Sequence, residues 1–139
     1  MVSRVRKAAI RAGYRSGFEK EFGLTYPHLL FEPRAYPYCH ERKLVEDLHG
    51  GALEDKKLTR KYTPDFVDVD DSVWYELKGR FTAADRKKMR WVKASYPDKR
   101  IVIVLQSPNN KLTKSAKSTY AEWCEKYGFP WLQFSPKGS

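Results

Sequence analysis

The chain has 139 residues, and its 27 Lys and Arg residues outnumber its 17 Asp and Glu residues to give a formal net charge of +10. This length suits one domain with a hydrophobic core, and the charge favours a polyanionic partner, most commonly nucleic acid. No stretch approaches the roughly 20 apolar residues of a membrane-spanning helix and no signal peptide is visible, so we expect an intracellular protein with no membrane partner.

The first 61 residues predict a basic N-terminal segment, a helix, a strand and a polar linking segment. Residues 1–15 hold basic side chains and no acidic one, which predicts a basic arm or an N-terminal helix. A helix is expected from Ser16 to near Gly23, because Ser16 and Glu19 have the spacing of a capping box. Residues 29–32 are expected to form a strand between two prolines. Residues 36–61 are expected to be a long polar linking segment, in which residues 43–48 are a candidate short helix.

Two runs rich in β-branched and aromatic residues, 66–69 and 72–77, predict a β-hairpin that turns at the two aspartates between them. Facing residues of such a hairpin have numbers that add to 141, so Asp65 should lie opposite Glu76, with Cβ atoms about 5 Å apart. Two facing carboxylates destabilise a hairpin unless a divalent cation binds between them. Lys78 follows Glu76 by two residues and should project from the same face.

These three side chains have the chemistry that phosphodiester cleavage requires. Carboxylates with Mg²⁺ hold a phosphate and lower the pKa of an attacking water, and a nearby lysine orients that water or stabilises the developing charge. The alternative is an acidic surface hairpin without chemistry, but the mostly apolar strands favour burial. Glu19 has two interpretations that can coexist, a helix-capping residue and a third carboxylate of the site.

The second half of the chain predicts alternating helices and strands. Thr82 should cap a basic amphipathic helix that Pro97 ends. The apolar run 101–105 is typical of a strand buried on both faces. A helix is expected from about Ser118 to Tyr127, followed by an edge strand at residues 131–134. The order of elements predicts an α/β fold with a mixed central β-sheet flanked by helices.

Basic side chains near the predicted hairpin, in the N-terminal arm and in a later loop are candidates for contacts to DNA phosphates. A solvated helix surface is the other interpretation, and the proximity of the helix to the hairpin favours phosphate contact, which carries no sequence code. The candidates are Arg4, Arg6, Lys7, Arg11, Arg15, Arg80, Arg86, Lys87, Arg90, Lys93, Lys111, Lys114 and Lys117.

Pro64-Asp65 together with Glu76-Leu77-Lys78 has the form of the PD-(D/E)xK nuclease signature. Five short segments, in the order expected for one nuclease family, surround this signature: RSGFE at 15–19, YTPDF at 62–66, ELKG at 76–79, DRKK at 85–88 and STYAEWCEK at 118–126. From about Arg11 to Phe134, the chain therefore resembles the phage endonuclease I family, Holliday-junction-resolving enzymes of the T-odd coliphage type.

The resemblance implies a restriction-endonuclease-like core with a catalytic set of Glu19, Asp65, Glu76 and Lys78. Asp65 and Glu76, with the backbone carbonyl of Leu77, would bind Mg²⁺ or Mn²⁺. Glu19 would complete the acidic site, and Lys78 would act near the nucleophilic water. The family cleaves four-way junctions and other branched DNA to leave 5′-phosphate and 3′-hydroxyl ends. Its members are homodimers in which the N-terminal segment of one subunit joins the sheet of the other.

We therefore expect one nuclease domain over residues 1–139, a Mg²⁺-dependent, structure-selective DNA endonuclease that acts in the cytoplasm of a bacterial host if a phage encodes it. Two alternatives stay open: an enzyme that nicks duplex DNA with the same active site, and a non-catalytic basic nucleic-acid-binding protein. The stretch between Glu32 and Tyr62 is longer and more charged than the linking segment of the family.

Overall fold

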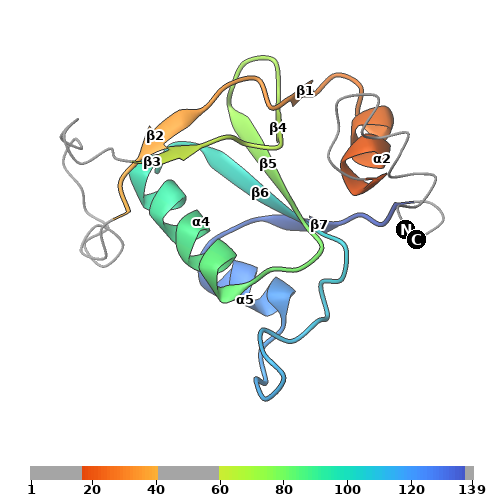
Figure 1. The fold of residues 1–139 in the computed structure, drawn as a ribbon, viewed down its shortest axis with the longest axis vertical. Helices are drawn as coiled ribbons and strands as arrows, with labels where there is room; N and C mark the ends of the chain where they lie inside the picture. Colours follow the sequence, from red (N-terminus) through yellow and green to blue (C-terminus); the bar gives the residue numbers. More distant parts are fainter. Residues whose placement is uncertain (1–16, 41–59, 137–139) are drawn as a thin grey trace.

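A five-stranded sheet forms the centre of the computed structural model, which describes residues 17–40 and 60–136 (Figure 1). The strands are ordered β1-β4-β5-β6-β7, and β2 and β3 form a separate two-stranded sheet. The helices are α2 (Gly17–Thr25), α4 (Ala83–Ser95) and α5 (Tyr120–Lys126). The strands are β1 (Leu30–Phe31), β2 (Tyr36–Tyr38), β3 (Arg60–Tyr62), β4 (Phe66–Val67), β5 (Val73–Lys78), β6 (Arg100–Leu105) and β7 (Trp131–Gln133).

The central sheet is mixed, which confirms the predicted fold class. Strand β6 pairs parallel with both β5 and β7, whereas β4 pairs antiparallel with both β1 and β5. Parallel neighbours need crossover connections, and α4 and α5 supply them. None of the helices in the described part of the chain is long and apolar enough to span a membrane.

The predicted hairpin register is confirmed, because Phe66 faces Tyr75 and Val67 faces Trp74. The turn is wider than predicted, and the first strand ends at Val67. The backbone N–H of Asp71 donates to the carbonyl of Asp68, and Asp71 has a positive φ of 59°. The residues predicted to extend the first strand therefore belong to the turn, where Val69 is 78% exposed.

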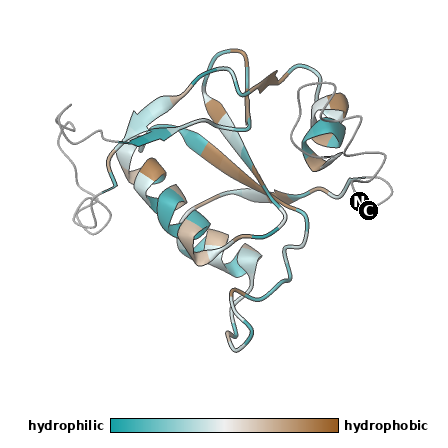
Figure 2. Cartoon of the chain, viewed as in Figure 1, coloured by the Kyte–Doolittle hydropathy of each residue, from teal (hydrophilic) through white to brown (hydrophobic). Residues whose placement is uncertain are grey.

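Each face of the sheet packs against its own helices. One core joins α4, α5 and the β2-β3 pair to side chains such as Trp74 and Ile103, and the other joins Phe22 of α2 to Leu77 and Val102. Alternate residues of β5 and β6 therefore contribute to opposite cores, and residues 101–105 are all buried, as their apolar run predicted. Figure 2 shows hydrophobic residues on these central strands and mostly hydrophilic ones along α4.

Local sequence signals set the helix ends. Capping boxes start α4, where Thr82 and Asp85 exchange hydrogen bonds, and α5, where Thr119 and Glu122 do the same. Helix α4 ends before Pro97, and α5 ends before Gly128, which has the positive φ of 77° that glycine adopts easily. Helix α2 continues to Thr25, beyond the predicted end near Gly23.

Both ends of the linking segment predicted over residues 36–61 form β-strands. Tyr36–Tyr38 pairs antiparallel with Arg60–Tyr62, and Tyr36, Tyr38 and Tyr62 are buried in the core beneath α4. Aromatic burial, which the polar composition of the segment obscured, provides the physical reason. The candidate helix at 43–48, the basic arm at 1–15 and the predicted cap at residue 16 lie outside the described residues.

Candidate active site

Strand β5 presents Glu76 and Lys78 on the sheet face that α4 covers. The two side chains alternate with Leu77, which points into the opposite core. The Lys78 ammonium lies 3.2 Å from Glu76 Oε2, so the prediction that both project from one face is confirmed. Glu76 is only 8% exposed although it is charged, and such burial requires polar partners.

Asp65 stands directly before β4, where it is 6% exposed. One step beyond the Phe66–Tyr75 pair, the register brings Asp65 opposite Glu76, as the sequence predicted. The backbone N–H of Leu77 donates a 2.8 Å hydrogen bond to Asp65 Oδ2. The carboxylate therefore satisfies the amide of the facing strand, and this bond fixes its position beside β5.

The Asp65 carboxyl lies in an unfavourable environment for a negative charge. Burial first, and then the neighbouring Glu76 carboxylate, raise its pKa to about 8, against a smaller lowering by the Leu77 N–H. Glu19 of α2 adds to this increase in pKa, so its charge acts on Asp65. Glu19 is itself 8% exposed. Asp65 and Glu76 thus form a buried carboxylate pair, and Glu19 lies near enough for its charge to act on Asp65; these three residues are called the acidic group.

Lys78 supplies positive charge to this group. Its ammonium contacts Glu76 Oε2 at 3.2 Å and Asp85 Oδ1, on the first turn of α4, at 3.3 Å. Burial lowers the pKa of Lys78, but the charges of Glu76 and Asp85 outweigh burial, and the net pKa is raised. Lys78 therefore carries its proton at neutral pH and acts as a hydrogen-bond donor.

Tyr62 is a partner of the candidate site that sequence reasoning missed. Its hydroxyl donates a 2.7 Å hydrogen bond to Glu76 Oε1, and its side chain is 1% exposed. Burial, followed by the charge of Glu76, raises the pKa of Tyr62 well above its usual value, so the hydroxyl stays protonated. Asp85, which contacts Lys78, is the other partner that was missed. Tyr62 and Asp85 belong to the segments YTPDF and DRKK, and their place in these segments was the only indication of a role that the sequence gave.

The donor set suits a hard divalent cation. Among the described residues, no three His, Cys, Asp or Glu side chains form a ready-made metal cage. Mg²⁺ seldom needs one, since it keeps several waters and takes one or two carboxylates together with phosphate oxygens. The Lys78 carbonyl accepts from the Gln106 N–H on the β6 side, so strand alternation turns the preceding carbonyl, of Leu77, to the β4 side of the strand. Asp65, Glu76 and this carbonyl therefore offer oxygen ligands in one place.

The predicted DNA-contacting residues form separate groups. One group lies around the start of α4, where Arg80 and Lys87 are exposed and Arg86 is half-buried. The same end of the helix carries Asp85, which contacts Lys78. Lys111, Lys114 and Lys117 are exposed in the segment between β6 and α5. The five basic residues of the arm, Arg4, Arg6, Lys7, Arg11 and Arg15, lie outside the described residues.

Cations of α4 also pack on aromatic rings, and the Lys87 ammonium lies 5.1 Å from the ring centroid of Trp91. Arg90 lies 4.2 Å from the centroid of Tyr127, and Lys93 lies 5.2 Å from that of Phe129, toward α5. Lys88, which was not among the predicted DNA contacts, lies 5.5 Å from the ring centroid of Tyr62, whose hydroxyl donates to Glu76. Arg90 and Lys93 thus lie against Tyr127 and Phe129, whereas Lys87 lies against Trp91.

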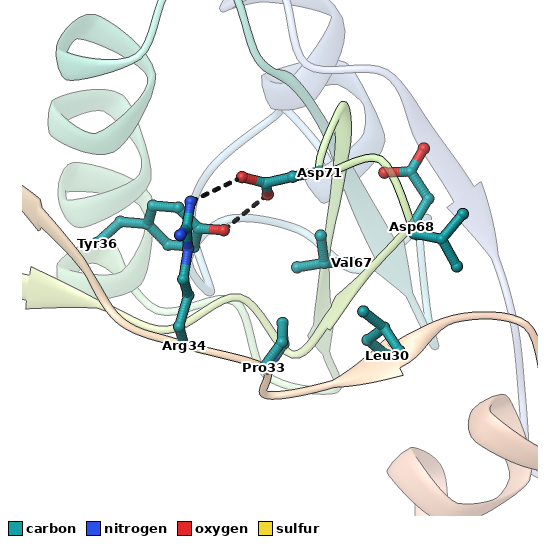
Figure 3. Close-up of a pocket in the computed structure, with 8 residues that line it drawn as sticks. Leu30, Pro33, Arg34, Tyr36, Val67, Asp68 and Asp71 are labelled. Carbon is teal, nitrogen blue, oxygen red and sulfur yellow. Dashed lines mark hydrogen bonds and ion pairs between the residues drawn. The ribbon is translucent and has the colours of Figure 1, made fainter.

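A separate hollow of about 240 Å³ lies at the other end of the hairpin, by the turn (Figure 3). Its lining includes Leu30 and Val67, and Asp71 accepts there from the Tyr36 hydroxyl at 2.7 Å and from Arg34 at 3.1 Å. None of the candidate catalytic residues lines this hollow. The hairpin therefore places its buried acidic group and its apolar hollow at opposite ends.

Comparison with known proteins places these residues in context. The model of the phage endonuclease I family matches residues 1–136. Endodeoxyribonuclease 1 of Enterobacteria phage T3 is 39% identical over 67 residues, which cover 48% of this chain and 43% of the relative. Endonuclease I of Escherichia phage T7 is 39% identical over 76 residues, covering 55% of this chain and 48% of the relative. Each match thus spans less than half of the relative's length.

Proposed function

The chain belongs to the phage endonuclease I family, and from this membership and its buried acidic group we propose that it is a metal-dependent DNA endonuclease that cleaves four-way junctions and other branched DNA. The observation that carries the proposal is the convergence of Asp65, Glu76 and Lys78 beside one another in a buried position. A buried carboxylate pair is costly for stability, and a catalytic role explains its presence.

Asp65, Glu76 and the Leu77 carbonyl would bind Mg²⁺, for which Mn²⁺ can substitute, and Glu19 would complete the acidic site. The bound cation supplies Lewis-acid chemistry, since it lowers the pKa of a coordinated water and neutralises charge on the phosphate. The protein fixes these ligands by burial and by hydrogen bonds: the Leu77 N–H holds Asp65, and the Tyr62 hydroxyl holds Glu76.

Lys78 would donate a hydrogen bond from its ammonium to the attacking water or to a non-bridging phosphate oxygen. Water would attack phosphorus in line and release a proton to solvent, the bond from phosphorus to O3′ would break, and O3′ would leave as a hydroxyl after taking a proton from solvent. The products are a 5′-phosphate and a 3′-hydroxyl. Charge that builds on the phosphate oxygens is stabilised by a donor already in place, so little reorganisation is needed.

The basic residues around the start of α4, Arg80, Arg86 and Lys87, would contact DNA phosphates next to the scissile bond. Lys111, Lys114 and Lys117 would contact a neighbouring stretch of backbone. Such contacts position DNA without reading bases, so selectivity would come from the shape and deformability of a branch point.

A homodimer would supply the two active sites that paired incisions need. Phe22 of α2 is fully buried, with its ring 5.0 Å from Phe66 and 5.9 Å from Tyr75. This face of the sheet is therefore covered by α2. The same helix from a partner subunit would cover it equally well if the two subunits exchanged their helices.

Cleavage in Mg²⁺ of an end-labelled four-way junction, beside a linear duplex with the sequence of one arm, tests the proposal. Symmetric cuts near the branch point, with the duplex intact, support a junction-resolving enzyme. Equal nicking of the duplex would identify the nicking alternative. Salt-sensitive binding without cleavage of either substrate would contradict the nuclease proposal.

A further inference from the structure

The two carboxylate oxygens of Asp85 serve two different elements. Oδ2 accepts a 3.1 Å hydrogen bond from the N–H of Thr82, which closes the capping box of α4. Oδ1 lies 3.3 Å from the ammonium of Lys78 on β5. Helix capping explains the first contact but does not require the second.

The start of α5 shows what capping alone requires. There Thr119 and Glu122 form the same kind of box, and Glu122 is exposed. Glutamate is the usual residue at this position, whereas α4 has the shorter aspartate. The Asp85 side chain is 29% exposed, and it lies beside a Lys78 side chain that is 19% exposed. The capping box of α4 thus contacts Lys78 beside the acidic group, whereas the box of α5 is exposed to solvent.

The segment that carries Asp85 is rigidly attached to the core. Phe81, directly before the cap, is fully buried, and its ring meets Trp123 edge-on at 5.0 Å and Tyr120 at 5.9 Å. A lysine side chain is flexible and has three N–H donors. Glu76 on one side and Asp85 on the other engage two of them, which directs the third.

We propose that Asp85 is a positioning residue of the active site, which holds the Lys78 ammonium from the side of α4 while Glu76 holds it from β5. This inference rests on the proposed nuclease function. Loss of the Asp85 charge leaves Lys78 with one carboxylate, and its ammonium then samples positions from which it cannot reach the phosphate. Cleavage slows, and DNA binding does not weaken, because the replacement removes a negative charge and leaves every proposed phosphate-contacting cation in place.

The test compares Asp85→Asn with two controls, Thr82→Ala and Glu122→Gln, in single-turnover cleavage of a four-way junction in Mg²⁺. Binding of the same junction in EDTA and the melting temperature are measured for each variant. Asp85→Asn should slow cleavage about 10- to 100-fold, as loss of an outer partner of a metal site typically does. Thr82→Ala weakens the same cap and Glu122→Gln removes a charge from the matching box of α5, and both should cleave at the wild-type rate.

A double-mutant comparison separates positioning from general destabilisation. If Asp85 acts through Lys78, Asp85→Asn should change the residual rate little in a Lys78→Ala background. A wild-type rate in Asp85→Asn, an equal loss in Thr82→Ala, or a full additional loss in the Lys78→Ala background would overturn the inference. Failure of the wild-type protein to cleave would instead overturn the proposed function.

Discussion

The hydroxyl of Tyr62 donates a 2.7 Å hydrogen bond to Glu76 Oε1 and so joins the two-stranded β2-β3 sheet to the acidic group of the central sheet. The other oxygen of Glu76 contacts Lys78. Glu76 is therefore oriented from both sides before any ligand binds, which is the arrangement that outer partners of metal-binding carboxylates provide.

Replacement Tyr62→Phe should weaken metal binding while the protein stays folded. The ring still fills the core, but Glu76 loses a donor, so we expect the Mg²⁺ concentration for half-maximal cleavage to rise about 10- to 100-fold. A Mg²⁺ titration of junction cleavage measures this. Tyr36→Phe is the matched control, because its hydroxyl donates a bond of the same 2.7 Å length to Asp71 at the other end of the hairpin. An equal effect of both replacements would contradict the role given to Tyr62.

Asp65→Asn should stabilise the metal-free protein at alkaline pH. Burial and Glu76 raise the pKa of Asp65 from 3.8 to about 8 in the folded state. The stability that the protonated group contributes is full below pH 3.8 and is lost as the pH rises through about 8. Asparagine has no such loss and can still accept from the Leu77 N–H.

Melting temperatures in EDTA from pH 5 to pH 9 should therefore show an advantage of Asp65→Asn that grows with pH. Asp71→Asn provides a control of opposite sign. Burial raises the pKa of Asp71, but bonds from Tyr36, Trp74 and Lys99 outweigh it, and the net pKa is lowered. The carboxylate of Asp71 therefore stabilises the fold at neutral pH, and Asp71→Asn should melt earlier. An Asp65→Asn variant that melts below wild type at pH 9 would refute the electrostatic account.

Addition of Mg²⁺ should stabilise the wild-type protein through its carboxylates. A cation at 100 times its dissociation constant contributes about 2.7 kcal/mol, which corresponds to several degrees for a domain of this size. Thermal melting with and without Mg²⁺ measures the shift, which Glu76→Gln should abolish and Glu122→Gln should retain. A shift that survives Glu76→Gln would place the cation elsewhere.

The protein should be a homodimer in solution. Size-exclusion chromatography with light scattering should give about twice the monomer mass of 16.3 kDa. Symmetric paired incisions need two active sites, which the proposed dimer would supply. A mass near that of the monomer would exclude paired incision by one assembly.

Sequence reasoning predicted how the candidate residues of the hairpin lie relative to one another, because their relation is local. A register in which residue numbers add to 141 places Asp65 against Glu76, and strand alternation places Lys78 beside it. Both rules depend on backbone geometry that β-branched and aromatic residues impose. The wider turn escaped prediction, because Asp68 accepts from the N–H groups of Ser72 and Val73 and so ends the strand early.

Partners contributed by other elements could not be predicted in this way. Tyr62 reaches Glu76 from the end of a polar segment, and Asp85 reaches Lys78 from a helix cap. Their positions depend on how the β2-β3 pair and α4 pack on the sheet, which no spacing in the sequence encodes. All of the predicted DNA contacts stay predictions, and five of them, in the basic arm, lie outside the described residues.

The most direct test of the central claim, that the buried acidic group cleaves DNA, compares Glu76→Gln with Glu122→Gln on one end-labelled four-way junction in Mg²⁺. Both replacements remove a single carboxylate charge, but only Glu76 lies in the acidic group. We predict that Glu76→Gln binds the junction at least as tightly as wild type and does not cut it, while Glu122→Gln cuts at the wild-type rate. Wild-type cleavage by Glu76→Gln would contradict the account.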